Sequence, residues 1–179
     1  ILWRGMRSEA EAGLADRQGI PAKTHSGGMQ QHAADVAEGS ARGSAGISLT
    51  KDPFIAARFA AQSAADVVCI HAAYLLRPAS EATGASVRAE LQAAGAGAVE
   101  LAYARAGSVD FTRKAGAKAL ENAGADERTL RYAAADAEWR HGGAIAAEAV
   151  LRGSMGKGLT MGAAVAASGD KRVPKMAYE

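Results

Sequence analysis

Hydrophobic and polar residues divide the chain into short strands and helices that follow no regular order. Apolar or β-branched runs predict strands in ILWRG at the start, in GISLT and in DVVCIHAAYLL. The segment GAVELAYA predicts a further strand. AIAAEAVLRGS is ambiguous, because alanine and glutamate favour a helix whereas the flanking glycines bound a stretch of strand length.

Helices are predicted where capping residues and hydrophobic spacing agree. Ser8 and Glu11 form a capping-box pattern ahead of a helix over residues 9–18. Asp52 and Pro53 supply an N-cap carboxylate and a first-turn proline to a second helix. Other helices are predicted within MQQHAADVAEG, over residues 86–94 and, as one or two helices broken near Gly124, over residues 112–140. Strands and helices that mix without regular alternation indicate the α+β class.

Length and composition limit the number of domains and the kinds of partner, disulfide and metal site that the chain can have. The 179 residues favour a single domain, predicted over residues 1–179, and the start at isoleucine suggests a fragment of a larger protein. The 21 basic and 19 acidic residues are nearly balanced, so net charge neither requires nor excludes a nucleic-acid partner. The only cysteine, Cys69, excludes an intrachain disulfide. No apolar run is long enough for a membrane span, and the histidines lack partners at metal-ligand spacing, so no metal is predicted.

Three stretches carry residues that packing alone does not require: LWRG, then GISLT with DPFIAARFA, then AEAVLRGS. In this order they resemble the Arg–Ser–Glu group of mono-ADP-ribosyltransferases, toxin domains found at the C-termini of polymorphic and Rhs-type bacterial proteins. The matching residues are Arg4, Ser48 with Thr50, and Glu148. The resemblance extends to about Ser154 and implies a split mixed or antiparallel β-sheet flanked by helices.

The resemblance implies that NAD is the substrate. Cleavage of the nicotinamide–ribose bond develops positive charge on the ribose, which a carboxylate stabilises, and Glu148 is the candidate. Arg4 suits the diphosphate or the adjacent ribose. Ser48 is expected to brace the glutamate or the ribose, and Thr50 to support the strand pair. The residues predicted to bind the dinucleotide are Arg4, Gly5, His32, Ser48, Thr50 and Phe59.

One departure from the family pattern concerns the acceptor. Many members carry a glutamate or glutamine two residues before the catalytic glutamate, where this chain has Ala146. Transfer to arginine is therefore doubtful, and the acceptor is left open between a protein residue, RNA and water. Asp136 and Glu138 offer the two-residue spacing, but Glu148 ranks first because EAVLRG is more similar to the family's late strand. Asp136 and Glu138 are instead expected to cap a helix.

The predicted function is that of an interbacterial toxin. The domain would be delivered into the cytoplasm of a target cell and transfer ADP-ribose to a protein or RNA acceptor. The producing cell would need a cognate immunity protein that plugs the NAD cleft. The alternatives are an NAD glycohydrolase and a non-catalytic interaction module.

Overall fold

The computed structural model describes residues 1–22, 28–37, 46–61, 65–77 and 81–153. These residues form two compact units, each assembled from separate chain segments. Unit 1 comprises Ile1–Ile20, Leu49–Ala72 and the chain from Ile145 onward, and unit 2 comprises Pro21–Ser48 and Ala73–Ala144. The chain thus passes from one unit to the other in the middle of a strand, between Ser48 and Leu49.

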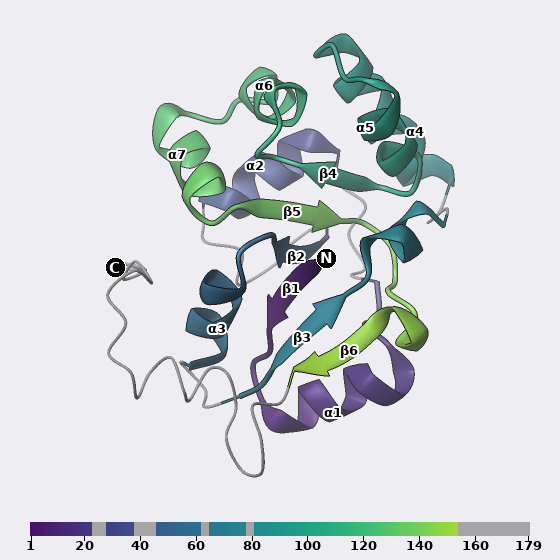
Figure 1. The fold of residues 1–179 in the computed structure, drawn as a ribbon. Coiled ribbons are helices and arrows are strands. Elements are labelled where there is room, and N and C mark those ends of the chain that lie inside the picture. Colours follow the sequence, from purple (N-terminus) through teal and green to yellow (C-terminus); the bar gives the residue numbers. More distant parts are fainter. Residues whose placement is uncertain (23–27, 38–45, 62–64, 78–80, 154–179) are drawn as a thin grey trace. The chain divides into compact units, whose positions relative to one another are not determined.

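Unit 1 is built on antiparallel strands. Its elements are β1 (Leu2–Gly5), α1 (Glu9–Gln18), the second half of β2 (Ile47–Thr50), α3 (Pro53–Ala61), β3 (Val67–Ile70), the 3-10 helix η2 (Ala147–Ala149) and β6 (Val150–Gly153). The strand order is β2-β1-β3-β6, and Figure 1 shows β1, β3 and β6 side by side. Helix α3 packs on β1, and α1 packs on β6 and η2.

The two α-helices described in unit 1, α1 and α3, begin where their capping residues predict. The Ser8 hydroxyl accepts a hydrogen bond from the Glu11 amide at 3.1 Å, while the Glu11 carboxylate reaches the Arg7 amide at 2.7 Å. At the start of α3, Asp52 Oδ1 accepts from the Phe54 amide at 2.8 Å. Because side chains satisfy these exposed amides, both helices start sharply.

Gly5 lies where α3 packs most closely against β1. A Cβ atom at Gly5 would stand 2.2 Å from the carbonyl oxygen of Ala56 and 2.7 Å from the amide nitrogen of Ala60. Both neighbouring atoms belong to the backbone and cannot rotate away. The close packing of these two elements therefore requires glycine at this position.

Replacing Gly5 with alanine is expected to lower the free energy of unfolding by about 1–3 kcal/mol, because the added methyl group forces the helix and strand apart. Urea denaturation measures the change. Gly13→Ala is the matched control, since Gly13 lies inside α1 and a Cβ there meets only Arg17 Nη1 at 3.4 Å. That substitution should stabilise the protein by about 0.5–1 kcal/mol. Equal stabilities of the two variants would contradict the packing argument.

The described part of unit 2 is mainly helical. Its elements are α2 (Met29–Ala37), the first half of β2, most of the 3-10 helix η1 (Ala72–Leu76), α4 (Glu81–Ala93), α5 (Ala98–Arg105), β4 (Ser108–Asp110), α6 (Lys114–Asn122), α7 (Glu127–Ala135) and β5 (Glu138–His141). The strand order is β4-β5-β2, and β4 pairs antiparallel with β5.

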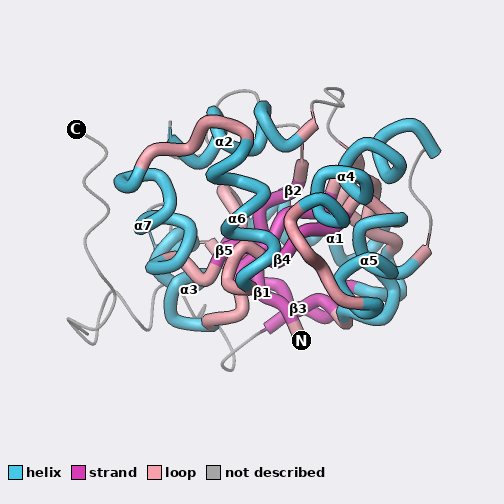
Figure 2. Tube along the Cα trace, turned by 90° about the horizontal axis from the view of Figure 1, so that it is seen from above, coloured by secondary structure: helices cyan, strands magenta, loops and turns pink. Residues whose placement is uncertain are grey.

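The core of unit 2 lies between its helices and β4. Helices α4, α5 and α6 contact β4, and α7 contacts β5 (Figure 2). The largest side chains of this core are those of Met29, Leu91, Phe111 and Leu120, packed among alanines. Burial of these apolar side chains is the main stabilising contribution that holds the helices on the strands.

The α+β class is confirmed, with antiparallel strand pairs and seven α-helices among the described residues. The strand predicted for GAVELAYA is wrong, because this segment forms α5, whose first turn is capped by the bond from the Gly97 amide to Glu100 Oε2 at 3.1 Å. DVVCIHAAYLL is a strand only at β3 and then turns into η1. Within the described residues, every helix is too short or too polar to traverse a bilayer.

Candidate functional site

Ser48 and Glu138 meet in unit 2, where β2 and β5 are neighbouring strands. The Ser48 hydroxyl donates a hydrogen bond to Glu138 Oε1 at 2.7 Å. Glu138 is the first residue of β5 and is only 7% exposed. The resemblance implies that Ser48 braces the glutamate or the ribose, and the glutamate that it contacts in this unit is Glu138.

Arg140 joins this pair to helix α2. It lies two residues after Glu138, so both side chains lie on the same face of β5. Its Nε donates to Glu138 Oε1 at 2.9 Å, and its Nη1 donates to Asp35 Oδ2 at 3.1 Å. Gln31, one turn earlier on α2, donates from Nε2 to Asp35 Oδ1 at 3.1 Å. These five residues, Ser48, Glu138, Arg140, Asp35 and Gln31, are called the Glu138 cluster below.

The two oxygens of the Glu138 carboxylate have different surroundings. Both hydrogen bonds, from Ser48 and from Arg140, fall on Oε1. No group among the described residues donates to Oε2, and the side chain keeps 10% of its surface exposed. One oxygen is thus anchored, and the other remains available to accept a hydrogen bond from a ligand hydroxyl.

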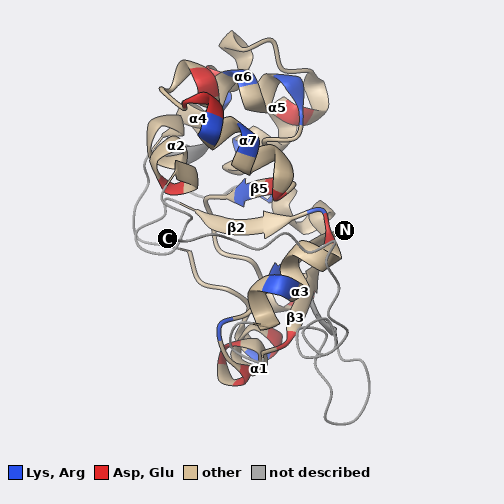
Figure 3. Cartoon of the chain, turned by 90° about the vertical axis from the view of Figure 1, so that its left-hand side faces the viewer, with Lys and Arg blue, Asp and Glu red and all other residues tan. Residues whose placement is uncertain are grey.

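Two carboxylates of the Glu138 cluster contact the same cation. Asp35 and Glu138 are two carboxylates that share the single guanidinium of Arg140, whose side chain is fully buried. In Figure 3 the arginine of β5 is seen in blue. Because the Arg140 side chain is fully buried, its interactions with both carboxylates are stronger than they would be in water.

The strand predicted around Glu148 is placed wrongly. Glu148 lies in the 3-10 helix η2, is exposed, and precedes β6 by two residues. This 3-10 helix lies between the isolated bridge of Ile145 with Ile20 and the start of β6, so the strand begins only after Glu148. Glu148 therefore lacks the strand position on which its first rank as catalytic carboxylate depended.

The predicted capping role of Asp136 and Glu138 holds for only one of them. Asp136 is the C-cap of α7, but Glu138 already belongs to β5. Between them, Ala137 adopts a positive φ of 46°, an uncommon conformation for a residue other than glycine. This single residue turns the chain from helix to strand. The signal that pointed to Glu138 was its two-residue spacing from Asp136.

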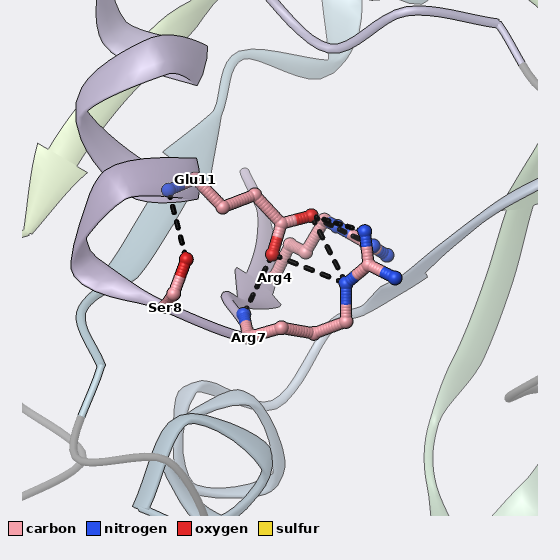
Figure 4. Close-up of polar contacts among 4 residues, drawn as sticks. All are labelled: Arg4, Arg7, Ser8 and Glu11. Atoms are coloured by element: carbon pink, nitrogen blue, oxygen red, sulfur yellow. Dashed lines mark hydrogen bonds and ion pairs between the residues drawn. The ribbon is translucent and has the colours of Figure 1, made fainter.

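Arg4 lies on β1 in unit 1, where it is part of a cluster of two arginines and one carboxylate (Figure 4). Its Nη2 is 4.0 Å from Glu11 Oε1, and the Arg7 Nη2 is 3.1 Å from the same oxygen. Burial raises the pKa of Glu11, but the hydrogen bonds from Arg7 and the charges of both arginines outweigh it, so the pKa is lowered overall. Glu11 thus stays ionised and holds the guanidinium of Arg4, the cation that the sequence predicts on this strand.

Thr50 and Phe59, two of the predicted dinucleotide-binding residues, lie in unit 1. Thr50 stands opposite Trp3 in the pairing of β1 with β2, and its hydroxyl accepts a hydrogen bond from the Asp52 amide at 3.0 Å. Thr50 therefore shapes the turn into α3 from the end of its strand. Phe59 is half-buried on α3.

His32 is a core residue of unit 2. It is 1% exposed and contacts Phe111 edge to face, with 6.0 Å between ring centroids. Burial, together with the charge of Arg140, lowers the pKa of His32 to about 3, so the ring is neutral near pH 7. Its burial argues against the predicted contact between His32 and a dinucleotide.

Ser108 and His141 form a second buried pair in unit 2. They stand opposite each other in the pairing of β4 with β5, and the Ser108 hydroxyl lies 2.7 Å from His141 Nδ1. The other ring nitrogen, Nε2, is 3.4 Å from the carbonyl oxygen of Ala144. Ser108 is 1% exposed and His141 is 2% exposed. A serine this deeply buried is not placed to act as a nucleophile, so the pair is structural.

The His141 pair makes stability depend on pH. Burial lowers the pKa of His141 from 6.5 to about 4, against the opposing effect of the bond to Ala144. As pH falls from 6.5 towards 4, the unfolded chain takes up a proton that the folded ring resists, so stability is lost. We expect the difference in unfolding free energy between wild type and His141→Gln to change by about 1.4 kcal/mol per pH unit in this window. Urea titrations at pH 7 and pH 5 measure it, and parallel pH dependences would contradict this assignment.

Comparison with protein-family models gives no match, and neither curated proteins nor solved structures give a significant match to the chain. Among the described residues, no group of three or more histidine, cysteine or acidic side chains is arranged to hold a metal ion. The features of the chain that bear on its function are therefore the Glu138 cluster and the motifs in the sequence.

Proposed function

We propose that the chain is an NAD-dependent ADP-ribosyltransferase in which Glu138, and not Glu148, is the carboxylate that acts on the nicotinamide ribose. The hydrogen bond of 2.7 Å between Ser48 and Glu138 is the observation that carries the proposal. It joins the Ser-x-Thr segment to a strand glutamate, which is the pairing that the resemblance implies. The ADP-ribosyltransferase type of the antiparallel sheet is part of the same proposal.

The proposed reaction uses the unequal oxygens of Glu138. The bond between the nicotinamide nitrogen and the ribose carbon breaks, its electron pair leaves with nicotinamide, and positive charge develops on the ribose. Glu138 stabilises that charge, while Oε2 accepts a hydrogen bond from the ribose 2′-hydroxyl. Ser48 and Arg140 keep Oε1 in place, so the carboxylate does not have to reorient during the reaction.

Asp136 supports transfer to a macromolecule over hydrolysis. With Glu138 as the catalytic glutamate, the position two residues earlier holds an acidic side chain, whereas the same position relative to Glu148 holds Ala146. Many members of the family that the chain resembles carry a glutamate or glutamine here, which helps to orient the acceptor, and this chain has the shorter aspartate. We therefore assign Asp136 to the acceptor: the acceptor nucleophile attacks the ribose carbon, its bond to that carbon replaces the bond to nicotinamide, and its proton passes to the Asp136 carboxylate and then to water.

The biological setting proposed here is that of a toxin module delivered into a target cell, with a cognate immunity protein in the producing cell. This part of the proposal is supported by the resemblance of the sequence motifs alone. The nearly balanced charge of the chain leaves protein and RNA as the two acceptor classes.

Incubation of the protein with labelled NAD tests the proposal. Nicotinamide release, together with label that becomes attached to a macromolecule in bacterial lysate, is the expected result. Protease or RNase treatment of the labelled product then identifies the acceptor class. Release of free ADP-ribose with no labelled macromolecule would favour a glycohydrolase. If no nicotinamide is released and calorimetry detects no binding of NAD, the protein is not an NAD enzyme.

A further inference from the structure

We propose that Asp35 is a positioning residue that keeps Glu138 Oε2 available to substrate by holding the guanidinium of Arg140 away from it. The arrangement is Asp35 to Arg140 to Glu138, within unit 2. The expected effect of Asp35 on kcat rests on the proposed function, whereas its effect on the position of the Glu138 carboxylate does not.

Arg140 is held by two carboxylates in two different directions. Its side chain is fully buried, so water does not compete for its donors. The Nε atom faces Glu138 and the Nη1 atom faces Asp35, whereas the buried Nη2 atom has no hydrogen-bond partner among the described residues. A guanidinium is a rigid planar fork, so fixing two of its nitrogens fixes the whole group.

Arg140 and Glu138 form one hydrogen bond with each other, although the guanidinium and the carboxylate could form two. Arginine–carboxylate pairs frequently form two parallel hydrogen bonds, one to each oxygen. Here only Nε and Oε1 take part: Nη2, the donor that would complete a bidentate pair, has no partner among the described residues, and the bond from Nη1 to Asp35 fixes the guanidinium in this orientation. A bidentate pair between Arg140 and Glu138 would occupy Oε2, which is the oxygen that the proposed reaction needs.

Asp35 is itself fixed on its helix. It is 4% exposed, and Gln31, one turn earlier on α2, donates to its Oδ1 at 3.1 Å. Each carboxylate oxygen of Asp35 therefore accepts its own hydrogen bond, one from the helix and one from Arg140. Through Asp35, helix α2 thus orients Arg140, a residue of β5 that lies more than 100 positions later in the sequence.

The first test measures the kinetics of nicotinamide release. Asp35→Asn is expected to lower kcat by about 10- to 100-fold with little change in KM, because a misplaced catalytic group affects the transition state more than ground-state binding. Asp35→Glu, which keeps the charge, should retain more activity than Asp35→Asn. The control is Asp16→Asn, an exposed carboxylate on α1, which should leave kcat unchanged.

A double-mutant cycle separates positioning from general loss of structure. If Asp35 acts through Glu138, Asp35→Asn causes no further loss of kcat in a protein that already carries Glu138→Gln. The same fold reduction in both backgrounds would mean that Asp35 acts independently of Glu138, and would overturn the inference.

The second test does not depend on activity and therefore separates this inference from the proposed function. In protein labelled with ¹³C at glutamate carboxyl carbons, Asp35→Asn should shift the NMR signal of Glu138, and Asp16→Asn should not. If wild type fails to cleave NAD but this shift is present, the proposed function is wrong and the positioning by Asp35 stands. An unchanged Glu138 signal would overturn the positioning. If Asp35→Asn does not fold, Gln31→Ala replaces it and is judged by the same signal.

Discussion

Replacing Glu138 with glutamine is expected to reduce kcat for nicotinamide release by about 100- to 1000-fold, the usual loss when a group that stabilises transition-state charge is removed. Glutamine has nearly the same shape and keeps one oxygen that accepts hydrogen bonds from Ser48 and Arg140. What it lacks is the negative charge beside the ribose. Because substrate binding relies on other contacts as well, KM should change far less than kcat.

Glu148→Gln is the matched control for this prediction. Glu148 is exposed in the 3-10 helix η2, so its replacement should leave both kcat and the thermal unfolding midpoint close to wild type. The opposite pattern, in which Glu148→Gln is inactive and Glu138→Gln retains full activity, would restore Glu148 as the catalytic carboxylate. Circular dichroism of both variants confirms that each is folded before rates are compared.

The largest effect on stability is expected from Arg140. Replacing it with methionine leaves the carboxylates of Asp35 and Glu138 without the cation that both contact. Both carboxylates are buried, and removing one partner of a buried ion pair typically costs about 3–5 kcal/mol. Urea denaturation at pH 7, where both carboxylates ionise in the unfolded chain, measures this loss.

An exposed ion pair on α7 supplies the control for Arg140. Arg131 Nη2 lies 3.4 Å from Glu127 Oε1, and both side chains are more than 70% exposed. Arg131→Met should therefore cost at most about 1 kcal/mol. If Arg140→Met were no more destabilising than Arg131→Met, the Glu138 cluster would not be a buried charge network in solution.

The sequence predicts best those elements whose boundaries are set by neighbouring residues. Helix α1 begins after Ser8 and α3 begins after Asp52 because each of these side chains satisfies an amide two or three positions further along the chain. The short strands β1 and β2 are predicted by apolar runs with clear ends. In all four cases the decisive interactions, or the decisive pattern, lie within a few residues.

The sequence does not predict β5, although the proposed site depends on it. The segment EWRH follows an alanine-rich helix without an intervening glycine, and Ala137 makes the turn in a conformation that alanine rarely adopts. All four residues of the strand are buried, including two with charged side chains. Their burial depends on partners such as Ser48, which lies 90 positions earlier. Local propensity contains no information about such a contact, so the sequence ranked Glu148 above Glu138.

The central claim is that NAD is cleaved at the glutamate that Ser48 braces. The measurement that tests it most directly is a crystal structure of the Glu138→Gln variant with NAD, since this variant should bind the dinucleotide but cleave it slowly. We predict that the 2′-hydroxyl of the nicotinamide ribose lies within hydrogen-bond distance of side chain 138. A nicotinamide ribose bound against Glu148, with side chain 138 out of reach of the dinucleotide, would contradict the account.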